Sequence, residues 1–403
     1  MTKPCGNFYD RFYRATIYVC VLSNLVFVLI TSHQSIDDIS ASQWNTLVED
    51  RYPFLRHEVL SAMEKHGCVG DHAGWIPRHL TFAQEGKLVG AMPVYEKHNS
   101  WGEFVFDHAW ADAYHRAGID YYPKLVNSVP FTPASGQRIL VTKQDQQQIT
   151  SHIIRAAKTL VDEGGYSGLH CLFPSPDYHA ALNQQGAISR NDCQFHWHHR
   201  GYQHFDDFLS TLKPKKRKNI RQERRKVADA GLNIRRLNGH TANEQDWLDF
   251  TRLYTLIYNR KYGVPAFNHH YFMEVAQGIP DQIHLVLVDD GSSPLAGALM
   301  YSDDNTLYGR HWGCDSYVDC LHFEVCYYQG IEMCIENGWQ RFDPGAQGEH
   351  KIARGFEATL MQSLHWMAQS PFNDAIAKFV SQEQQGVQRY IDAVKQHSPY
   401  QTT

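Results

Sequence analysis

The segment FDPGAQGEHKIARGF, residues 342–356, holds the residue types best suited to chemistry in this 403-residue chain. An apolar run ends in Asp343, two glycines follow, and then come Glu349, His350 and Lys351. Glycine lets a backbone adopt positive φ or approach a ligand closely, so ligand-seeking backbone and titratable side chains share one loop. We call residues 343–356 the glycine loop and expect it to border an active site.

A basic segment is the second candidate for binding chemistry. Residues 213–226 contain nine Lys or Arg and a single acid, Glu223. On a helix, Arg217 and Arg221 lie one turn apart, and like charges at this spacing repel one another. An anion would relieve that repulsion, which predicts a phosphate-binding surface at Lys216, Arg217 and Arg221. The alternative is a solvated helix that packs only through its apolar residues.

Two further groups precede the glycine loop. Arg310 and Trp312 are two residues apart in a predicted strand, so their side chains share one face, which we expect to point toward a cleft. The helix that follows begins with His322, Glu324 and Tyr328 in its first turns. An acid near a helix N-terminus is also favoured by the helix dipole, so Glu324 has a structural explanation as well.

The elements that position these residues alternate between strands and helices, which predicts an α/β fold. In the first half we expect a strand at 26–32, a helix at 53–67, strands within 77–97 across a turn at Glu85-Gly86, a helix at 147–162 and a strand at 168–174. In the second half we expect a helix at 213–231, a strand at 233–237, a helix at 244–258, a three-stranded meander at 283–314, a helix at 321–338, a strand at 339–343 and a helix at 373–395.

The composition sets further bounds. Hydrophobic residues make up 43% of the chain, enough for one or two real cores, and the net charge of −5 indicates no particular partner. The nine Cys form no CxxC pair, which favours reduced thiols and a cytoplasmic location. His196 and His198 would share one face of a strand, and we interpret them as a polar strand edge, so no metal site is predicted.

The N-terminus allows three interpretations. Residues 15–31 carry no charge and follow Lys3, Arg11 and Arg14, as in a signal anchor with a basic flank. The run is short for a span, which needs about 20 residues. It fits equally well with the first strand of a soluble domain, or with a start codon assigned too far upstream.

Several motifs together resemble one family. They are PRHL (77–80), YYPKL (121–125), PFTPASGQR (130–138), LYGRHWGC (307–314), LHFE (321–324) and GAQGEHK (345–351). With them, the chain resembles a group of bacterial FemAB-related predicted N-acyltransferases, labelled for peptidoglycan biosynthesis or recognition. The family's Asp-x-Gly loop, Lys and Gly-Phe are similar to Asp343, Gly345, Lys351, Gly355 and Phe356. The closer group has Glu-Ala where this chain has Asp343-Pro344, and Gly-Tyr-x-Pro where it has Gly355-Phe356-Glu357-Ala358. These departures affect the loop's fine geometry.

The resemblance implies a fold of two GNAT-like halves, each a mixed twisted sheet flanked by helices. These halves would cover residues 26–205 and 206–385, with an extension or anchor at 1–25 and a tail at 386–403. It also implies transfer of an acyl or aminoacyl group from an activated donor to an amine, on a peptidoglycan precursor or a small molecule. No bound cofactor is expected; the donor would be acyl-CoA or aminoacyl-tRNA. The alternative is a non-catalytic module that binds a cell-wall precursor or RNA through the basic helix.

Roles for individual residues follow from this reaction, since a base must neutralise the amine and donors must stabilise the oxyanion. Glu349 or His350 would be the base or relay, and Lys351 and Arg354 would clamp an anion, with Asp343 orienting the loop. The other catalytic candidates are His322 and Glu324. The remaining substrate-binding candidates are Arg310, Trp312, Tyr328, Lys124, Glu103, Asp107 and Arg138.

Overall fold

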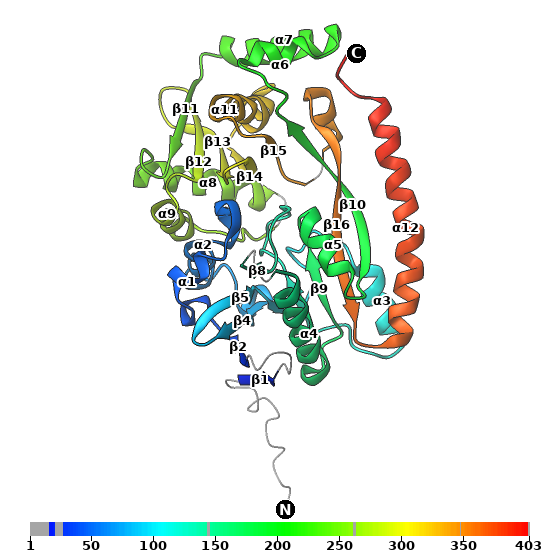
Figure 1. Cartoon of the computed structure of the whole chain (residues 1–403). Helices are drawn as coiled ribbons and strands as arrows, with labels where there is room; N and C mark the ends of the chain where they lie inside the picture. The colour runs from blue at the N-terminus through cyan, green and yellow to red at the C-terminus, as the bar shows by residue number, and fades with distance from the viewer. Residues whose placement is uncertain (1–15, 21–26, 143–145, 261–262, 347, 402–403) are drawn as a thin grey trace, which may run out of the picture.

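The computed structural model describes residues 16–20, 27–142, 146–260, 263–346 and 348–401, which form two sheets covered by helices (Figure 1). This arrangement confirms the predicted α/β class. The predicted extension or anchor at 1–25 lies mostly outside these residues, and Thr16–Cys20 is strand β1. In the described part of the chain, no helix combines the length and the apolar character that crossing a bilayer requires.

The smaller sheet belongs to the first half of the sequence. Its order is β1-β2-β4-β5-β8. Beyond β1 its strands are β2 (Phe27–His33), β4 (His79–Gln84), β5 (Lys87–Met92) and β8 (Leu140–Val141). The predicted turn between β4 and β5 is present, and Glu85 and Gly86 both have positive φ there.

The larger sheet has the order β11-β12-β13-β14-β15-β10-β16-β9-β7-β6-β3. Its second-half strands are β11 (Asn233–Asn238), β12 (Ile283–Asp289), β13 (Pro294–Ser302), β14 (Thr306–Cys314), β15 (Arg341–Asp343) and β16 (Glu357–Met367). Its first-half strands are β3 (Trp75–Pro77), β6 (Tyr95–Lys97), β7 (Lys124–Asn127), β9 (Gly168–Leu172) and β10 (Ile188–His198).

The two halves share this sheet because β16 crosses into the first half. It pairs antiparallel with both β10 and β9, while β10 also pairs with β15. The predicted boundary at residue 205 falls at the first residue of α6 (Phe205–Ser210), and the larger sheet continues across it. The predicted tail boundary at 385 lies within α12 (Ser370–Gln396), which extends along β10 and β16 (Figure 1).

Helices cover both parts of the structure. Those of the first half are α1 (Ala41–Asn45), α2 (His57–Lys65), α3 (His108–Arg116), α4 (Gln146–Gly164) and α5 (Pro176–Asn183). Those of the second half are α6 (Phe205–Ser210), α7 (Pro214–Asp229), α8 (Glu244–Arg260), α9 (His269–Gly278), α10 (Leu321–Phe323), α11 (Gln329–Asn337) and α12 (Ser370–Gln396). A π-helical turn, η7 (Glu324–Tyr328), joins α10 to α11, and a 3₁₀ helix, η8 (Glu349–Arg354), forms within the glycine loop.

One hydrophobic core crosses the boundary between the halves. Phe54 of the first half packs against Tyr301 and Tyr308 of the second, with ring centroids 5.2 Å apart in both pairs. The same cluster includes Leu60 from α2 and Phe272 from α9. Because buried apolar contact is the main stabilising term in folding, this shared core fixes the cleft that lies between the halves.

Candidate active site

A cleft of about 810 Å³ lies between the two halves. Its first-half lining consists mainly of aromatic and small polar residues: Asn99, Ser100, Trp101, Phe104, Phe106, Tyr122 and Phe131. Its second-half lining includes Tyr258, Phe267, Arg310, His311, Pro344 and Gly345. The glycine loop therefore borders a cleft, through residues 344–346.

Strands β14 and β15 part where the cleft begins. They pair in parallel only over 306–308 and 341–343, after which β14 continues to Cys314 and the chain leaves β15. A bulge in the β13–β14 pairing places Leu299 opposite His311 and Met300 opposite Gly309, which leaves Arg310 as the extra residue. Bulges re-aim side chains, and here the Arg310 side chain turns to Asp343.

Buried charges fasten the glycine loop. Arg310 donates to both carboxylate oxygens of Asp343, at 2.8 and 3.2 Å, and Asp343 accepts the Gly345 N–H at 2.9 Å. Burial alone would raise the pKa of Asp343, but Arg310 and His196 hold it well below its usual range. Lys351 is 2% exposed and donates to the Gly345 carbonyl at 2.6 Å. Burial lowers the pKa of Lys351 to about 8.

The other predicted catalytic side chains of the loop contact residues outside the cleft lining. Glu349 accepts a hydrogen bond from Tyr390 at 2.7 Å, and His350 Nε2 lies 2.8 Å from the Tyr327 hydroxyl. Burial, with Arg354 and Lys351 nearby, lowers the pKa of His350. Arg354 pairs with Glu223 at 2.7 Å, so it binds the loop to α7.

The residues predicted around the helix entry also make internal contacts. Glu324 is 3% exposed and pairs with Arg224 of α7 at 3.0 Å, and Tyr328 donates to Glu223. The rings of Trp312 and His322 pack at 5.2 Å, and burial lowers the pKa of His322 to about 4. These contacts join α7 to η7 and β14 to α10.

The predicted phosphate-binding residues of α7 lie on its outer side. Arg221 pairs with Asp206 at 2.9 Å, with both side chains more than half exposed. Arg217 reaches the Ser210 carbonyl at 3.5 Å, a weak contact, and Lys216 makes no ion pair within the described chain. Exposed pairs of this kind contribute about 0–1 kcal/mol, so the surface charge stays accessible.

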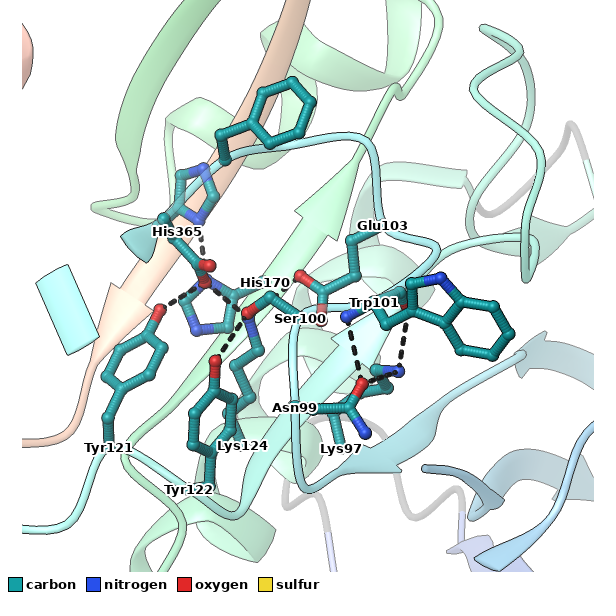
Figure 2. A network of polar contacts seen from close by, with 12 residues as sticks. Lys97, Asn99, Ser100, Trp101, Glu103, Tyr121, Tyr122, Lys124, His170 and His365 are labelled. Carbon is teal, nitrogen blue, oxygen red and sulfur yellow. Dashed lines mark hydrogen bonds and ion pairs between the residues drawn. The ribbon is translucent and has the colours of Figure 1, made fainter. Parts of the chain in front are cut away.

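A second buried charge cluster, centred on Lys124, lies behind the first-half lining of the cleft (Figure 2). Lys124 is 0% exposed; it donates to Glu103 at 2.8 Å and to Asp107, which also accepts from Tyr121 at 2.6 Å. Burial raises the pKa of Glu103, whereas Lys124 and His170 hold the pKa of Asp107 below its usual range against the effect of burial. Lys124, Glu103 and Asp107, predicted from the sequence to bind substrate, thus bind one another and do not line the cleft.

Hydrogen bonds connect this cluster, and the neighbouring Lys97, with the lining of the cleft. Lys124 donates to Ser100 Oγ at 2.9 Å, and Ser100 Oγ lies 2.8 Å from the Tyr122 hydroxyl (Figure 2). Lys97 donates to the Trp101 carbonyl at 3.1 Å, and burial lowers its pKa to about 7. The buried charges therefore hold the backbone and side chains that form the cleft surface.

Arg138, the last predicted substrate-binding residue, is buried away from the lining. Its guanidinium donates to the carbonyls of Leu172, Gln137 and Ala134 at 2.5–2.8 Å. Because five donors of an arginine can satisfy several carbonyls at once, Arg138 fixes the Pro-rich loop at 129–138 to β9.

His311 was not predicted from the sequence. Nor were the exposed rings of Trp101, Phe104 and Phe106, which lie among the predicted acids Glu103 and Asp107. His311 lies between the two residues selected on β14 and lines the cleft among aromatic rings; Phe267 is nearest at 5.1 Å. Burial lowers its pKa to about 3, so the imidazole is neutral at ordinary pH. The interleaving of aromatic and acidic residues from Trp101 to Asp107 was the available signal for these exposed rings.

In this sheet two parallel strands, β14 and β15, part at the cleft. Two solved structures share the fold. FemX has a TM-score of 0.53 at 11% identity, covering 84% of this chain and 98% of its own. The C-terminal domain (DUF2156) of a putative lysylphosphatidylglycerol synthetase from Agrobacterium fabrum has a TM-score of 0.50 at 9% identity, covering 85% and 95%.

The family model for FemAB-like proteins, described as peptidoglycan biosynthesis/recognition, matches residues 35–402, and the chain belongs to this family. A comparison with curated proteins gives no match. Family membership confirms the resemblance found in the sequence motifs and, together with the fold, supports a transferase role.

Proposed function

We propose that this protein is an N-acyltransferase whose reaction takes place in the cleft between the halves. One observation carries the proposal: β14 and β15 part at the cleft, and the glycine loop, whose Gly345 N–H is held by Asp343, lines the cleft through residues 344–346. Beyond residue 308 the edge of β14 is not paired with β15, so its backbone can hydrogen-bond an acyl donor.

The reaction forms a C–N bond from the amine lone pair to the acyl carbonyl carbon and breaks the carbonyl's bond to the leaving sulfur or oxygen. The amine loses a proton and the leaving group takes one up. In the cleft, His311 is a neutral imidazole that can accept a hydrogen bond from the attacking amine, and Tyr122 offers a hydroxyl. We assign His311 the role of orienting the amine, because the predicted bases Glu349 and His350 contact Tyr390 and Tyr327 instead.

Acyl-CoA and aminoacyl-tRNA remain the two donors in this proposal, and the acceptor is an amine. The family description supports an acceptor related to peptidoglycan. The donor is best identified by incubating the purified full chain with each radiolabelled donor and a panel of amines, and by following the label into an amide.

The variant that tests the site is His311→Phe, which keeps a ring among its aromatic neighbours. We expect transfer to fall by about 100-fold, the scale on which misplacing a reactant slows a reaction. His240→Phe is the control, because His240 is exposed and pairs with Asp281. Failure of the wild-type chain to consume either donor would reject the proposal.

A second candidate function, a non-catalytic RNA-binding or precursor-binding module, is supported by the outer side of α7. Lys215, Lys218 and Arg225 are exposed and make no ion pair within the described residues. Under this alternative, Lys218→Gln with Arg225→Gln reduces RNA affinity and the slope of affinity against salt. Arg155→Gln with Lys158→Gln on α4 is the matched control, and the alternative requires that no donor is consumed.

A further inference from the structure

The first-half side of the cleft presents a row of exposed aromatic side chains. Trp101, Phe104 and Phe106 are 46%, 37% and 60% exposed. With Phe131, which completes the same surface, we call them the aromatic wall. Glu103 and Asp107 alternate with these rings and are each 2% exposed. The acids point inward to Lys124 while the rings point outward, so the ion pairs hold the rings toward the cleft.

Backbone conformation indicates that this display has a cost. Phe104 and Phe131 both have positive φ, 59° and 57°. Such a conformation is an outlier for a bulky residue, and strain of this kind costs on the order of 1–3 kcal/mol and clusters at ligand sites. Gly102 makes room for one ring, because a Cβ there would lie 2.5 Å from Phe131 Cδ1.

The aromatic surface continues across the boundary between the halves. Trp101 and Phe131 pack edge to face at 4.8 Å, and Phe131 packs on Phe267 of the second half at 5.9 Å. Tyr258 lines the same second-half side. A ligand in the cleft therefore meets rings on both sides.

The charge of the lining is equally specific. Among the described residues that line the cleft, Arg310 has the one permanent charge, and its side chain is 3% exposed and bound to Asp343. His311 is neutral at ordinary pH. Lys97 and Lys124 lie behind the wall and are both 0% exposed. Among the described lining residues no lysine and no unpaired arginine is left to bind a phosphate or a carboxylate, and the lining's second imidazole is that of His108.

We infer that the aromatic wall binds the acceptor as an ammonium group on a flat-faced ring, and that this part of the acceptor carries neither phosphate nor carboxylate. Aromatic faces attract ammonium ions and stack on flat apolar faces. Phosphate and carboxylate would lose hydration here without gaining a lysine or a free arginine as partner. This inference rests on the proposed N-acyltransferase function and specifies its acceptor; the ring is either aromatic or that of an amino sugar.

Binding to the full chain tests the inference with two matched pairs of probes. Phenethylamine and phenylalanine differ by a carboxylate, and glucosamine and glucosamine 6-phosphate differ by a phosphate. In at least one pair, calorimetry is expected to show tighter binding of the amine that lacks the acidic group, which is phenethylamine or glucosamine. The pair that shows this difference identifies the kind of ring. Phe106→Ala should weaken that binding roughly 2- to 10-fold, the range of one aromatic contact. Phe379→Ala, which removes a 44% exposed ring on α12, should leave it unchanged.

Three results would overturn the inference: equal or tighter binding of the phosphorylated and carboxylated probes, unchanged binding in Phe106→Ala, or no binding of either phenethylamine or glucosamine at millimolar concentration. The transfer assay separates these results from a failure of the proposed function. If the enzyme acylates phosphorylated amines, the acceptor assignment is wrong and the acyltransferase stands. If the ring amines bind but no donor is consumed, the site exists without the proposed reaction.

Discussion

The glycine loop and the aromatic wall face the same cleft and are both held by buried charges, but they offer different groups to a ligand. In the glycine loop, Asp343 and Lys351 bind the N–H and the carbonyl of Gly345, so backbone is presented. In the aromatic wall, Glu103 and Asp107 bind Lys124, so the side chains between them are presented. In both regions the charged residues act as fasteners, and the residues beside them form the surface.

Removing the central cation of the wall should have the largest effect. Lys124→Met leaves the carboxylates of Glu103 and Asp107 buried without their partner. Breaking a buried pair in this way costs about 3–5 kcal/mol of unfolding free energy, measured by urea denaturation. Lys351→Met removes one hydrogen bond to a carbonyl and should cost only about 1–2 kcal/mol.

Lys158→Met on α4 is the control for both changes, because Lys158 is exposed and should alter stability by less than about 0.5 kcal/mol. Similar losses in Lys124→Met and Lys351→Met would contradict this order, because they would show that the two regions are fastened with equal strength.

Matched glycine substitutions compare the two surfaces directly. Gly102→Ala places a Cβ 2.5 Å from the Phe131 ring at φ +80°, and Gly345→Ala places one 3.3 Å from the Gly309 carbonyl at φ +91°. Both changes strain the backbone by roughly 1–2 kcal/mol, and the closer contact adds to the first. We expect Gly102→Ala to be the less stable variant and to bind ring amines more weakly. Gly345→Ala should lower acyl transfer while leaving that binding intact; the reverse pattern would exchange the assigned roles.

A smaller, pH-dependent effect should appear in both regions. Burial lowers the pKa of Lys97 to about 7 and that of Lys351 to about 8, from 10.5. Between its lowered pKa and 10.5, each lysine binds fewer protons in the folded than in the unfolded state, so its contribution to stability rises with pH. The unfolding free energy of the wild type should therefore rise by at least about 1 kcal/mol relative to that of Lys97→Met from pH 7 upward. Relative to Lys351→Met it should rise in the same way from pH 8 upward. Urea denaturation at a series of pH values measures this effect. Differences in unfolding free energy between the wild type and each variant that stayed constant with pH would contradict it.

Local patterns were sufficient to predict most elements and the position of the glycine loop. The helix at 321–338 and the hairpin turn at Glu85-Gly86 follow from periodicity and turn residues, and both are present. The pairing of β16 between β9 and β10 joins residues far apart in sequence, so no local pattern indicates it.

The site was predicted less completely, for a related reason. A charged residue such as Lys124 or Asp343 has the same appearance in the sequence whether it meets substrate or another side chain. The partner decides between a catalytic and a fastening contact, and the fold supplies the partner. Arg310 and the segment at 344–346 line the cleft, whereas His311 carries no pattern that distinguishes it from its neighbours.

The position of β16 also has a consequence for synthesis on the ribosome. Strands β9 and β10 emerge well before β16, which must insert between them. Until then each strand has an open edge, and open edges invite pairing with other chains. The nascent N-terminal half is therefore a natural client for a chaperone that shields strand edges during translation, and it is expected to aggregate when it is expressed alone.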